Sequence, residues 1–444
     1  MPASVWAGER RALTTGLVLT ITLVAVESLA VATILPDIKD DLGGLGLYGW
    51  VFSAFFLGSI VGVVVAGQLT DLRGPATAYA LGLGLFVLGL LVGGTAPTML
   101  VLVIGRAVQG LGAGAVPATA YASIGRAYPE ALRPRVFAIM STAWVVPGLL
   151  GPGLASAVSH AVGWRWVFLG LVPLSVVAGS IAYRPLRSLA VAGERVPSRL
   201  PDALRVAVGA GLALAGLTTD SALVAAALVA LGGVVGLPSF LRLVPVGTLR
   251  GRPGLPAATL SRGVLTFAFF GADAYVPLAI TDARGRSTLF AGVALTVSAL
   301  SWTAGSWLQE RMVGRLGARR FVRAGHAVLF AGIATAGLVL WDAVPVFVIA
   351  VAWTIAGFGI GLSYAPISLA VLREAPPGQE GTATAGMQLT DLLGIALGTG
   401  LGGAAIALGD SLGWSPKVGI GGAWAMAASM ALVGVWVGRG LPDT

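Results

Sequence analysis

The 444-residue chain is 56% hydrophobic and only 11% charged, and its mean hydropathy is +0.89. Two to four soluble domains, which this length would otherwise suggest, need more ionisable side chains than these to solvate their surfaces. The apolar residues are spread over the whole chain, so the composition predicts several membrane spans and excludes a soluble enzyme with one anchor.

Residue types that serve catalysis and energy coupling are scarce. Cysteine is absent, which excludes disulfides, thiolate catalysis and cysteine-bound metal. Neither lysine, Lys39 or Lys417, stands in a GxxxxGK[ST] phosphate loop, so the chain has no such device for hydrolysing ATP. His160 and His326 give neither an HExxH site nor a Ser-His-Asp arrangement. We therefore expect no enzyme, no metal site and no cofactor, and a transport process would draw on an ion gradient or a partner subunit.

Apolar runs long enough to cross a bilayer divide the chain into three parts, because a core of about 30 Å takes roughly 20 helical residues. Six runs come first, two follow an arginine-rich connector, and six more complete the chain. This pattern predicts an all-α integral membrane protein with fourteen transmembrane helices. The predicted domains are a six-helix bundle at 1–183, a connector with an inserted hairpin at 184–261, and a second six-helix bundle at 262–444. The predicted spans are 13–36, 48–70, 76–96, 99–123, 135–159, 164–183, 203–219, 221–241, 262–281, 288–308, 321–340, 344–371, 381–408 and 418–438.

The basic residues between these spans fall unevenly on the two sides of the membrane. Most of the 28 lie on one side, including Arg262 at the start of its span. The sparse side holds Lys39, Arg165, Arg284, Arg286 and Lys417. Since cytoplasmic loops carry the excess of Lys and Arg, both termini are predicted to be cytoplasmic. The net charge of +9 thus reflects orientation in the bilayer and predicts no nucleic-acid partner.

Four ionisable residues fall well inside predicted spans: Glu27, Arg106, Asp273 and Asp391. A charge there costs a few kcal/mol, so each needs a partner or a wet cavity and is a functional candidate. Glu27 and Arg106 both lie roughly 14–15 Å deep, at 1.5 Å per residue, so they can form an ion pair or share a cavity. Burial favours the protonated form of a carboxylic acid and a bound cation favours its ionised form, so a proton and a cationic substrate can compete for one acid.

This competition leads to the hypothesis that Glu27 is the main proton-coupling residue. Asp273 and Asp391 would form a second acidic centre in the other half of the chain. Structural alternatives stay open for each residue. Glu27 and Arg106 can form a static salt bridge, Asp273 can accept a hydrogen bond from a neighbouring helix, and local polar neighbours can satisfy Asp391. Glycines at four-residue spacing, Gly58/Gly62 and Gly394/Gly398/Gly402, predict close helix packing.

Several segments resemble the major facilitator superfamily. Residues 67–74 (GQLTDLRG) resemble its GxLaDrxG loop, and the resemblance implies that Asp71 and Arg73, with Gly74, tie helix ends together on the cytoplasmic side in one state. The basic residues usual after this loop are replaced here by Pro-Ala-Thr at 75–77. Read alone, the segment is a solvated turn. Residues 106–112 (RAVQGLG) resemble the RxxQGxG motif, which implies a role for Arg106 in proton transfer or in holding the acidic site.

Three further segments narrow the resemblance to one branch of the superfamily. Residues 148–152 (GLLGP) are similar to the GxxGP antiporter motif; physically, Gly148, Gly151 and Pro152 predict a close-packed, bent helix. Residues 27–36 (ESLAVATILP) and 164–168 (WRWVF) resemble signatures of the fourteen-spanner drug:proton antiporters. The resemblance implies two pseudo-symmetric six-helix bundles plus two inserted central helices, in a bacterial cytoplasmic (inner) membrane.

Together these features predict a proton-coupled secondary active exporter of amphipathic small molecules, cationic drugs among them, that works by alternating access. Its expected partners are a small-molecule substrate, protons and the lipid bilayer, and we expect a monomer. An exporter of a lipid or self-made metabolite and a proton-coupled importer are the alternatives. The candidate cavity-lining aromatics are Trp144, Phe269, Tyr275, Trp353 and Tyr364.

Overall fold

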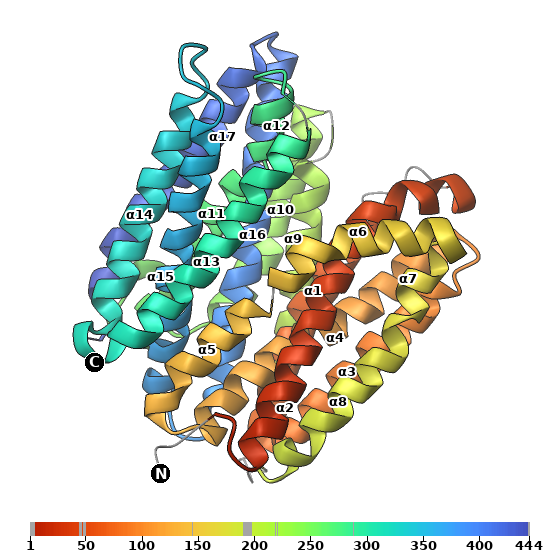
Figure 1. Ribbon diagram of the computed structural model, residues 1–444, viewed down its shortest axis with the longest axis vertical. Coiled ribbons are helices and arrows are strands. Elements are labelled where there is room, and N and C mark those ends of the chain that lie inside the picture. Colours follow the sequence, from red (N-terminus) through yellow and green to blue (C-terminus); the bar gives the residue numbers. More distant parts are fainter. Residues whose placement is uncertain are drawn as a thin grey trace. The chain divides into compact units, whose positions relative to one another are not determined.

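The computed structural model describes residues 5–43, 47, 50–143, 145–189, 198–217, 219, 221–286 and 288–442. Within these residues the regular structure is entirely helical, which confirms the all-α prediction (Figure 1). A helix or a pair of consecutive short helices lies over each predicted span. The helices are α1 (Glu9–Leu42), α2 (Trp50–Arg73), α3 (Pro75–Gly94), α4 (Met99–Ala127), α5 (Arg133–Thr142), α6 (Val145–Val162), α7 (Arg165–Leu169), α8 (Leu171–Arg187), α9 (Leu200–Leu217), α10 (Ala222–Leu243), α11 (Leu255–Asp273), α12 (Val276–Thr281), α13 (Thr288–Leu316), α14 (Ala318–Leu338), α15 (Val348–Glu374), α16 (Glu380–Ser411) and α17 (Pro416–Val437).

Twelve stretches among the described residues are helical, long and apolar enough to cross a membrane. The α5–α6 region would be a thirteenth if it is one span, bent by 45°. Helix α13 is not among the twelve; its interior carries several polar side chains, including the buried Ser298, Ser301, Ser306 and Gln309. The predicted count of fourteen spans therefore stays a prediction.

The chain forms two compact units. Unit 1 comprises Met1–Gly211, Gly232–Leu243 and Ala375–Gly386; unit 2 comprises Leu212–Leu231, Val244–Glu374 and Met387–Thr444. The hairpin helices α9 and α10 contribute to both units, and so does α16, whose first turns belong to unit 1. The division into domains at 183/184 and 261/262 stays a prediction.

Helices α2 and α4 of unit 1 pack with their backbones almost in contact. A Cβ atom at Gly62 would lie 2.0 Å from the carbonyl oxygen of Leu111, and one at Gly110 would lie 2.0 Å from that of Phe55. Gly58 meets α4 in the same way. Any side chain larger than hydrogen at these positions would push the helices apart, which confirms the predicted close packing.

The glycines of α16 make the corresponding approach to α11 in unit 2. A Cβ atom at Gly394 would lie 2.3 Å from the carbonyl oxygen of Gly263, and one at Gly398 would lie 2.5 Å from that of Phe267. Gly402 instead faces the ring of Tyr275. Because α16 and α11 lie in close contact, side chains at the same level of these two helices can reach each other.

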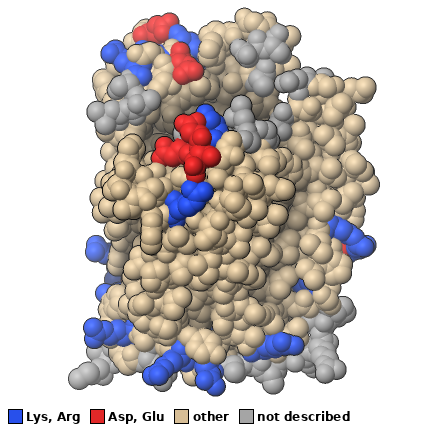
Figure 2. Space-filling view, turned by 90° about the vertical axis from the view of Figure 1, so that its right-hand side faces the viewer, with Lys and Arg blue, Asp and Glu red and all other residues tan. Residues whose placement is uncertain are grey.

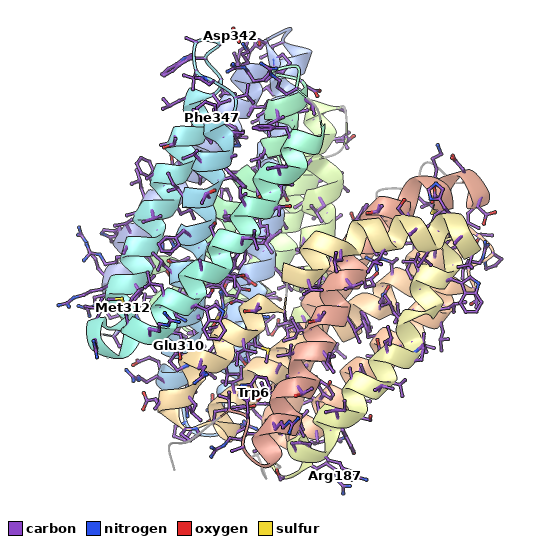
Figure 3. The ribbon with its side chains drawn as sticks, viewed as in Figure 1. Trp6, Arg187, Glu310, Met312, Asp342 and Phe347 are labelled. Atoms are coloured by element: carbon purple, nitrogen blue, oxygen red, sulfur yellow. The ribbon has the colours of Figure 1, made fainter. Side chains whose placement is uncertain are left out.

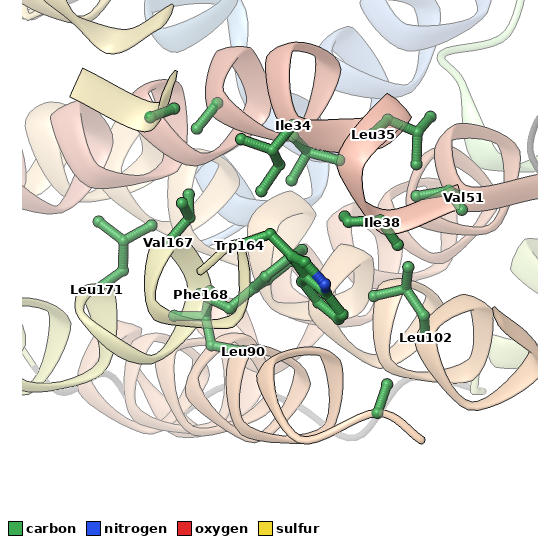
Figure 4. Close-up of a cluster of buried hydrophobic side chains, with 14 of the residues drawn as sticks. Ile34, Leu35, Ile38, Val51, Leu90, Leu102, Trp164, Val167, Phe168 and Leu171 are labelled. Atoms are coloured by element: carbon green, nitrogen blue, oxygen red, sulfur yellow. The ribbon is translucent and has the colours of Figure 1, made fainter. Parts of the chain in front are cut away.

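A cluster of buried apolar side chains holds the second half of α1 in unit 1 (Figure 4). Ile34, Leu35 and Ile38 of α1 pack in one cluster with residues of α2, α3, α4, α7 and α8. Val24 and Ala30 belong to the same cluster and flank the turn that carries Glu27. Packing therefore fixes the position of a charged side chain in the middle of an apolar helix.

Charged side chains avoid a broad part of the surface. Figure 2 shows an extensive uncharged area, with basic side chains at one end and a mixture of acidic and basic side chains toward the other. In unit 2, Asp342 and Phe347 lie at one end of the helices, whereas Glu310 and Met312 lie at the opposite end (Figure 3). Uncharged surface between charged ends is the pattern of helices that cross a bilayer.

Candidate functional site

The two charges predicted inside the spans of unit 1 meet in the structure. Arg106 Nη1 of α4 donates to Glu27 Oε1 of α1, and both residues are 1% exposed. Arg106 Nη1 also donates to Gln109 Oε1 (2.8 Å), and its Nε donates to the carbonyl oxygen of Val51 (3.1 Å). The guanidinium lies over the ring of Phe55, 4.1 Å from its centroid. Helices α2 and α4 thus hold the arginine, and α1 supplies the acid.

Glu27 uses only one carboxylate oxygen in this pair. Its Oε2 is buried, and no described residue donates a hydrogen bond to it. The Nε2 group of Gln109 is likewise buried and unpartnered among the described residues. An unpartnered buried acceptor is costly, and a proton on that oxygen would neutralise the charge. The geometry therefore leaves a position where Glu27 can take up a proton without displacing another hydrogen bond.

In unit 2, Asp391 of α16 has two partners that the sequence analysis did not assign to it. The hydroxyl of Tyr364 donates to Asp391 Oδ2 (3.2 Å), and Arg262 Nε lies 3.7 Å from Asp391 Oδ1. The Arg262 guanidinium stacks on the ring of Tyr364, 3.4 Å from its centroid, and donates to Ser368 Oγ. Partners from α11 and α15 thus contact the acid, whereas the hydroxyl of Thr390 beside it donates to the carbonyl oxygens of Thr259 and Met387.

The structure corrects the expected position of Arg262. It was expected at the rim of a span starting at 262, but it lies in α11, which begins at Leu255, and it is 0% exposed. Pro256 at the start of the helix and the uncharged residues after it were the available signal, because proline favours the first turn of a helix. Each unit therefore carries one buried arginine beside a buried acid.

The second acid of unit 2, Asp273, lies at the end of α11 and is half-buried. Its Oδ1 accepts a hydrogen bond from Trp353 Nε1 of α15 (2.6 Å). The structural alternative for Asp273, a hydrogen bond from a neighbouring helix, is thus present, and its role in binding a proton or substrate stays a prediction. Tyr275, two residues further on, is also half-buried and donates its hydroxyl hydrogen to the carbonyl oxygen of Thr399.

Aromatic rings form a continuous chain through unit 2. Trp353 stacks on Phe269 (6.3 Å between centroids), Phe269 meets Trp302 edge to face (5.5 Å), and Trp302 contacts Tyr364 (5.3 Å). The first ring is the hydrogen-bond donor to one acid of this unit, and the last is the donor to the other. Phe269 and Trp353 are buried, so they serve the core, and Tyr364 is half-buried. Trp144 lies outside the described residues.

The segment 67–74 binds the start of α16, within unit 1. Asp71 Oδ1 accepts hydrogen bonds from Arg126 Nη2 (2.7 Å) and the Gly381 amide (2.8 Å), and Oδ2 accepts from the Thr382 amide (2.6 Å). Arg126 Nη2 also donates to Glu380 Oε2 (2.9 Å). A carboxylate at the free amides of a helix N-terminus is stabilised by the helix dipole as well as by these bonds.

Arg126, at the end of α4, occupies the place that the resemblance implied for Arg73. Arg73 is exposed, and its side chain makes no ion pair or hydrogen bond with the described residues. Gly74 has φ 84°, a left-handed conformation that favours glycine, and it precedes α3 directly. Sequence reasoning missed Arg126 and Glu380, since their only signal was a charge at a helix end.

The segment 164–168 anchors the end of α1. Arg165 Nη1 donates to Asp41 Oδ2 (2.6 Å), and Trp164 Nε1 donates to the same oxygen (3.1 Å). The hydrogen bond from Arg165, followed by that from Trp164, lowers the pKa of Asp41 below its ordinary value. This segment therefore has a structural role at the same end of unit 1 as the apolar cluster.

The segment 148–152 is bent but is not close-packed at its first glycine. Within α6, Gly153–Val162 is bent by 45° against the piece Glu130–Gly148, and Pro152 at this break has no backbone donor. A Cβ atom at Gly148 would meet no other atom within 4 Å, although Gly151 is buried. The prediction of a bend is confirmed, and the prediction of close packing at Gly148 is wrong because that position faces open space.

Surface grooves lie apart from the buried acids. Grooves of about 450, 550 and 360 Å³ lie between α14 and α17, between α1 and α8, and between α3 and α8. None of these three is lined by Glu27, Asp273 or Asp391.

Comparison with known proteins identifies the family. Residues 17–399 match the family model of the Major Facilitator Superfamily. The chain belongs to the major facilitator superfamily. It is therefore a multi-pass membrane transporter and not an enzyme.

Relatives and solved structures agree with this assignment. Over 414 residues the chain is 28% identical to a probable multidrug-efflux transporter of Mycobacterium tuberculosis (strain H37Rv), covering 87% of this chain and 85% of the relative. It is 25% identical over 412 residues to the multidrug transporter protein MdtP of Bacillus subtilis, covering 89% and 75%. The human organic anion transporter MFSD10 matches with a TM-score of 0.74 at 14% identity, covering 97% of this chain and 100% of that chain. The proton:xylose symporter XylE matches with a TM-score of 0.69 at 14% identity, covering 96% and 94%. At these identities the solved structures show the fold alone.

Proposed function

We propose that this transporter is a proton-coupled exporter of amphipathic small molecules, cationic drugs among them, that works by alternating access. The observation that carries the proposal is the buried Glu27–Arg106 pair, in which one carboxylate oxygen lacks a hydrogen-bond donor among the described residues. Two relatives named as multidrug transporters support the substrate class. The resemblance of residues 148–152 to the GxxGP antiporter motif supports the direction.

In the proposed cycle Glu27 exchanges a proton for cargo. A proton taken up from outside neutralises Glu27 and releases Arg106, which keeps its contacts with Gln109, Val51 and Phe55. A cationic substrate entering from the cytoplasm favours the ionised acid, so the proton leaves as the substrate binds. Arg106 tunes the proton affinity of Glu27, because its charge stabilises the carboxylate.

The other buried charges extend this cycle. Asp391 and Asp273 are two separate acidic sites of unit 2 in this proposal, joined by the chain of aromatic rings, and Arg262 lies beside Asp391 as Arg106 lies beside Glu27. Asp71 and Arg126 form a latch on the first turn of α16 that biases the transporter toward one state.

The proposed architecture is that of a fourteen-spanner drug:proton antiporter. It has two pseudo-symmetric six-helix bundles, and α9 and α10 are the two inserted spans. The protein works as a monomer in the bacterial cytoplasmic membrane, with both termini in the cytoplasm. In such a membrane its activity would confer resistance to exported antibiotics.

Proton release from everted membrane vesicles tests the coupling. Vesicles with an acidified lumen receive candidate cations and neutral lipophiles, and lumen pH is followed. We expect an exported compound to raise lumen pH with the wild-type protein and with Glu374→Gln, an exposed acid at the end of α15. Glu27→Gln is expected to release no protons.

Two results would refute the proposal. No compound releases protons from wild-type vesicles, or Glu27→Gln releases them as well as the wild type does. An importer would instead accumulate substrate in whole cells when the medium is acidified, and an exporter of a lipid or self-made metabolite would respond to that compound and not to drugs.

A further inference from the structure

A groove on unit 2 has the dimensions of one lipid leaflet. It has a volume of about 450 Å³ and lies between α14 and α17, at the end of the unit that carries Asp342 (Figure 3). Along α17 it extends from Lys417 to Ala428, roughly 16 Å at 1.5 Å per residue. This is about half of a hydrocarbon core of about 30 Å. A ligand along the full groove would therefore reach from the headgroup level to the middle of the bilayer.

The walls of this groove are apolar and partly made of small residues. Ile333 and Gly337 line it on α14, Leu340 lines it just after the end of that helix, and Gly421, Ala425 and Ala428 line it on α17. Such a floor offers dispersion contacts to a flexible hydrocarbon chain and no hydrogen bond to a polar ligand. Trp341 stands at the mouth and is 66% exposed, as aromatic side chains at the membrane–water interface are.

The mouth of the groove carries an excess of positive charge. Lys417 Nζ lies 2.5 Å from Asp342 Oδ1, and Arg284 Nε lies 3.9 Å from the same oxygen. The hydrogen bond from Lys417 lowers the pKa of Asp342, so this carboxyl is ionised at neutral pH. Both terminal nitrogens of Arg284 donate hydrogen bonds to carbonyl oxygens within residues 339–344. Among the described side chains, Lys417 and Arg284 thus both face the Asp342 carboxylate, and Lys417 lines the groove.

The inner wall of the groove is preformed. Trp424 is 2% exposed, donates its indole hydrogen to the carbonyl oxygen of Ala272 (3.1 Å), and stacks on Trp353 (6.3 Å between centroids). Trp353 in turn is the hydrogen-bond donor to Asp273. A ligand in the groove would therefore press on a fixed aromatic surface that continues to the half-buried Asp273.

We propose that the groove between α14 and α17 binds one phospholipid, with an acyl chain on the apolar floor and the phosphate at Lys417. The leaflet-length apolar floor accounts for the chain, and the extra positive charge at the mouth accounts for the phosphate.

Photolabelling of the purified full-length protein in dodecylmaltoside micelles tests this site. The probe is a phosphatidylglycerol with a diazirine in one acyl chain, and a diacylglycerol with the same chain lacks only the phosphate headgroup. Labelled peptides are identified by mass spectrometry. We expect labels on residues 333–341 and 417–428, and no competition by glycerol phosphate, which has no acyl chain.

Three variants distinguish binding of the acyl chain from binding of the phosphate headgroup. Gly421→Leu places a bulky side chain in the groove, where a Cβ atom at this position would already lie 3.4 Å from Leu340 Cδ1, and should abolish this labelling. Ala428→Leu at the far end of the groove is a second filling variant. Lys417→Gln should lower labelling by phosphatidylglycerol about fivefold, the effect of one basic side chain near a membrane surface, and leave diacylglycerol labelling unchanged. The matched control Gly84→Leu, in open space beside α8, should label like the wild type.

The proposal is overturned if labels spread evenly over the lipid-facing helices, or if both filling variants label like the wild type. It is also overturned if Lys417→Gln leaves phosphatidylglycerol labelling intact. Competition by glycerol phosphate would show a soluble phosphate site instead of a lipid site. None of these outcomes depends on proton transport, so the proposal of a lipid site and the proposal of a proton-coupled exporter are tested independently.

Discussion

Removal of either partner from the buried Glu27–Arg106 pair should have unequal consequences. Glu27→Gln leaves a guanidinium that is 1% exposed and does not lose its proton in proteins. Arg106→Gln leaves a carboxylic acid, which can become neutral by taking up a proton. We therefore expect Glu27→Gln to lower the free energy of unfolding more than Arg106→Gln does.

The remaining contacts of Arg106 determine the magnitude. Loss of one partner of a buried ion pair costs about 3–5 kcal/mol. In Glu27→Gln the arginine keeps Gln109, Val51 and the ring of Phe55, so we expect the low end, about 3 kcal/mol. Arg106→Gln removes hydrogen bonds and leaves a neutral acid, which should cost about 1–2 kcal/mol. The double variant has two neutral amides in contact, so its cost should fall short of the sum by about 2 kcal/mol.

Reversible unfolding of the purified protein by sodium dodecyl sulfate in mixed micelles measures these differences. The exposed control Glu374→Gln should stay within about 0.5 kcal/mol of the wild type. The reasoning is refuted if Arg106→Gln is the more destabilising change, or if the two single effects simply add. Either result would show that the pair is not a coupled buried charge pair.

Three further changes test other parts of the structure. Arg126→Gln should lower the free energy of unfolding by about 2 kcal/mol, because the Arg126 guanidinium lies between two carboxylates. Arg73→Gln should have no measurable effect in the same unfolding assay. Equal effects of the two substitutions would contradict the latch geometry. Gly62→Ala should lower the free energy of unfolding by about 3 kcal/mol, since the new Cβ atom would lie 2.0 Å from a backbone oxygen. The control Gly84→Ala, in open space, should be tolerated. The purified yield and the unfolding midpoint measure both effects, and a Gly62→Ala protein that matches the wild type would contradict the prediction. Because the pKa of Asp41 is lowered in the folded state, its contribution to stability is present above its ordinary pKa and is lost as the pH falls through the lowered value. Melting temperatures recorded from pH 7 to pH 3 should show this loss in the wild type and not in Asp41→Asn; identical profiles would exclude it.

The part of the candidate site that depends on depth was predictable from the sequence. Helical rise is constant, so the positions of Glu27 and Arg106 relative to the ends of their spans placed them at one level. The charge cost inside a bilayer then required a partner for each. The structure brings the two together as an ion pair, and the spacing of Gly58 and Gly62 correctly indicated the close α2–α4 contact.

Contacts between distant parts of the chain were not predictable in this way. Arg126 and Glu380 are 254 residues apart, and their contact depends on where the start of α16 packs. Arg262 was placed at a rim because a charge marked the edge of an apolar run, although buried partners on α15 and α16 keep it inside. Gly148 was expected to pack closely, but small size permits contact without requiring it.

The close glycine contacts between α2 and α4 make these two helices act as one rigid pair. Arg106 and Arg126 sit roughly 30 Å apart on α4, at 1.5 Å per residue, and Val51 and Asp71 are separated by the same number of residues on α2. One end of this helix pair therefore holds Glu27, and the other end holds the first turn of α16. In the proposed cycle, protonation of Glu27 frees Arg106, and a tilt of α2 and α4 that starts there would reach Asp71, because the close glycine contacts leave these two helices no room to slide past each other.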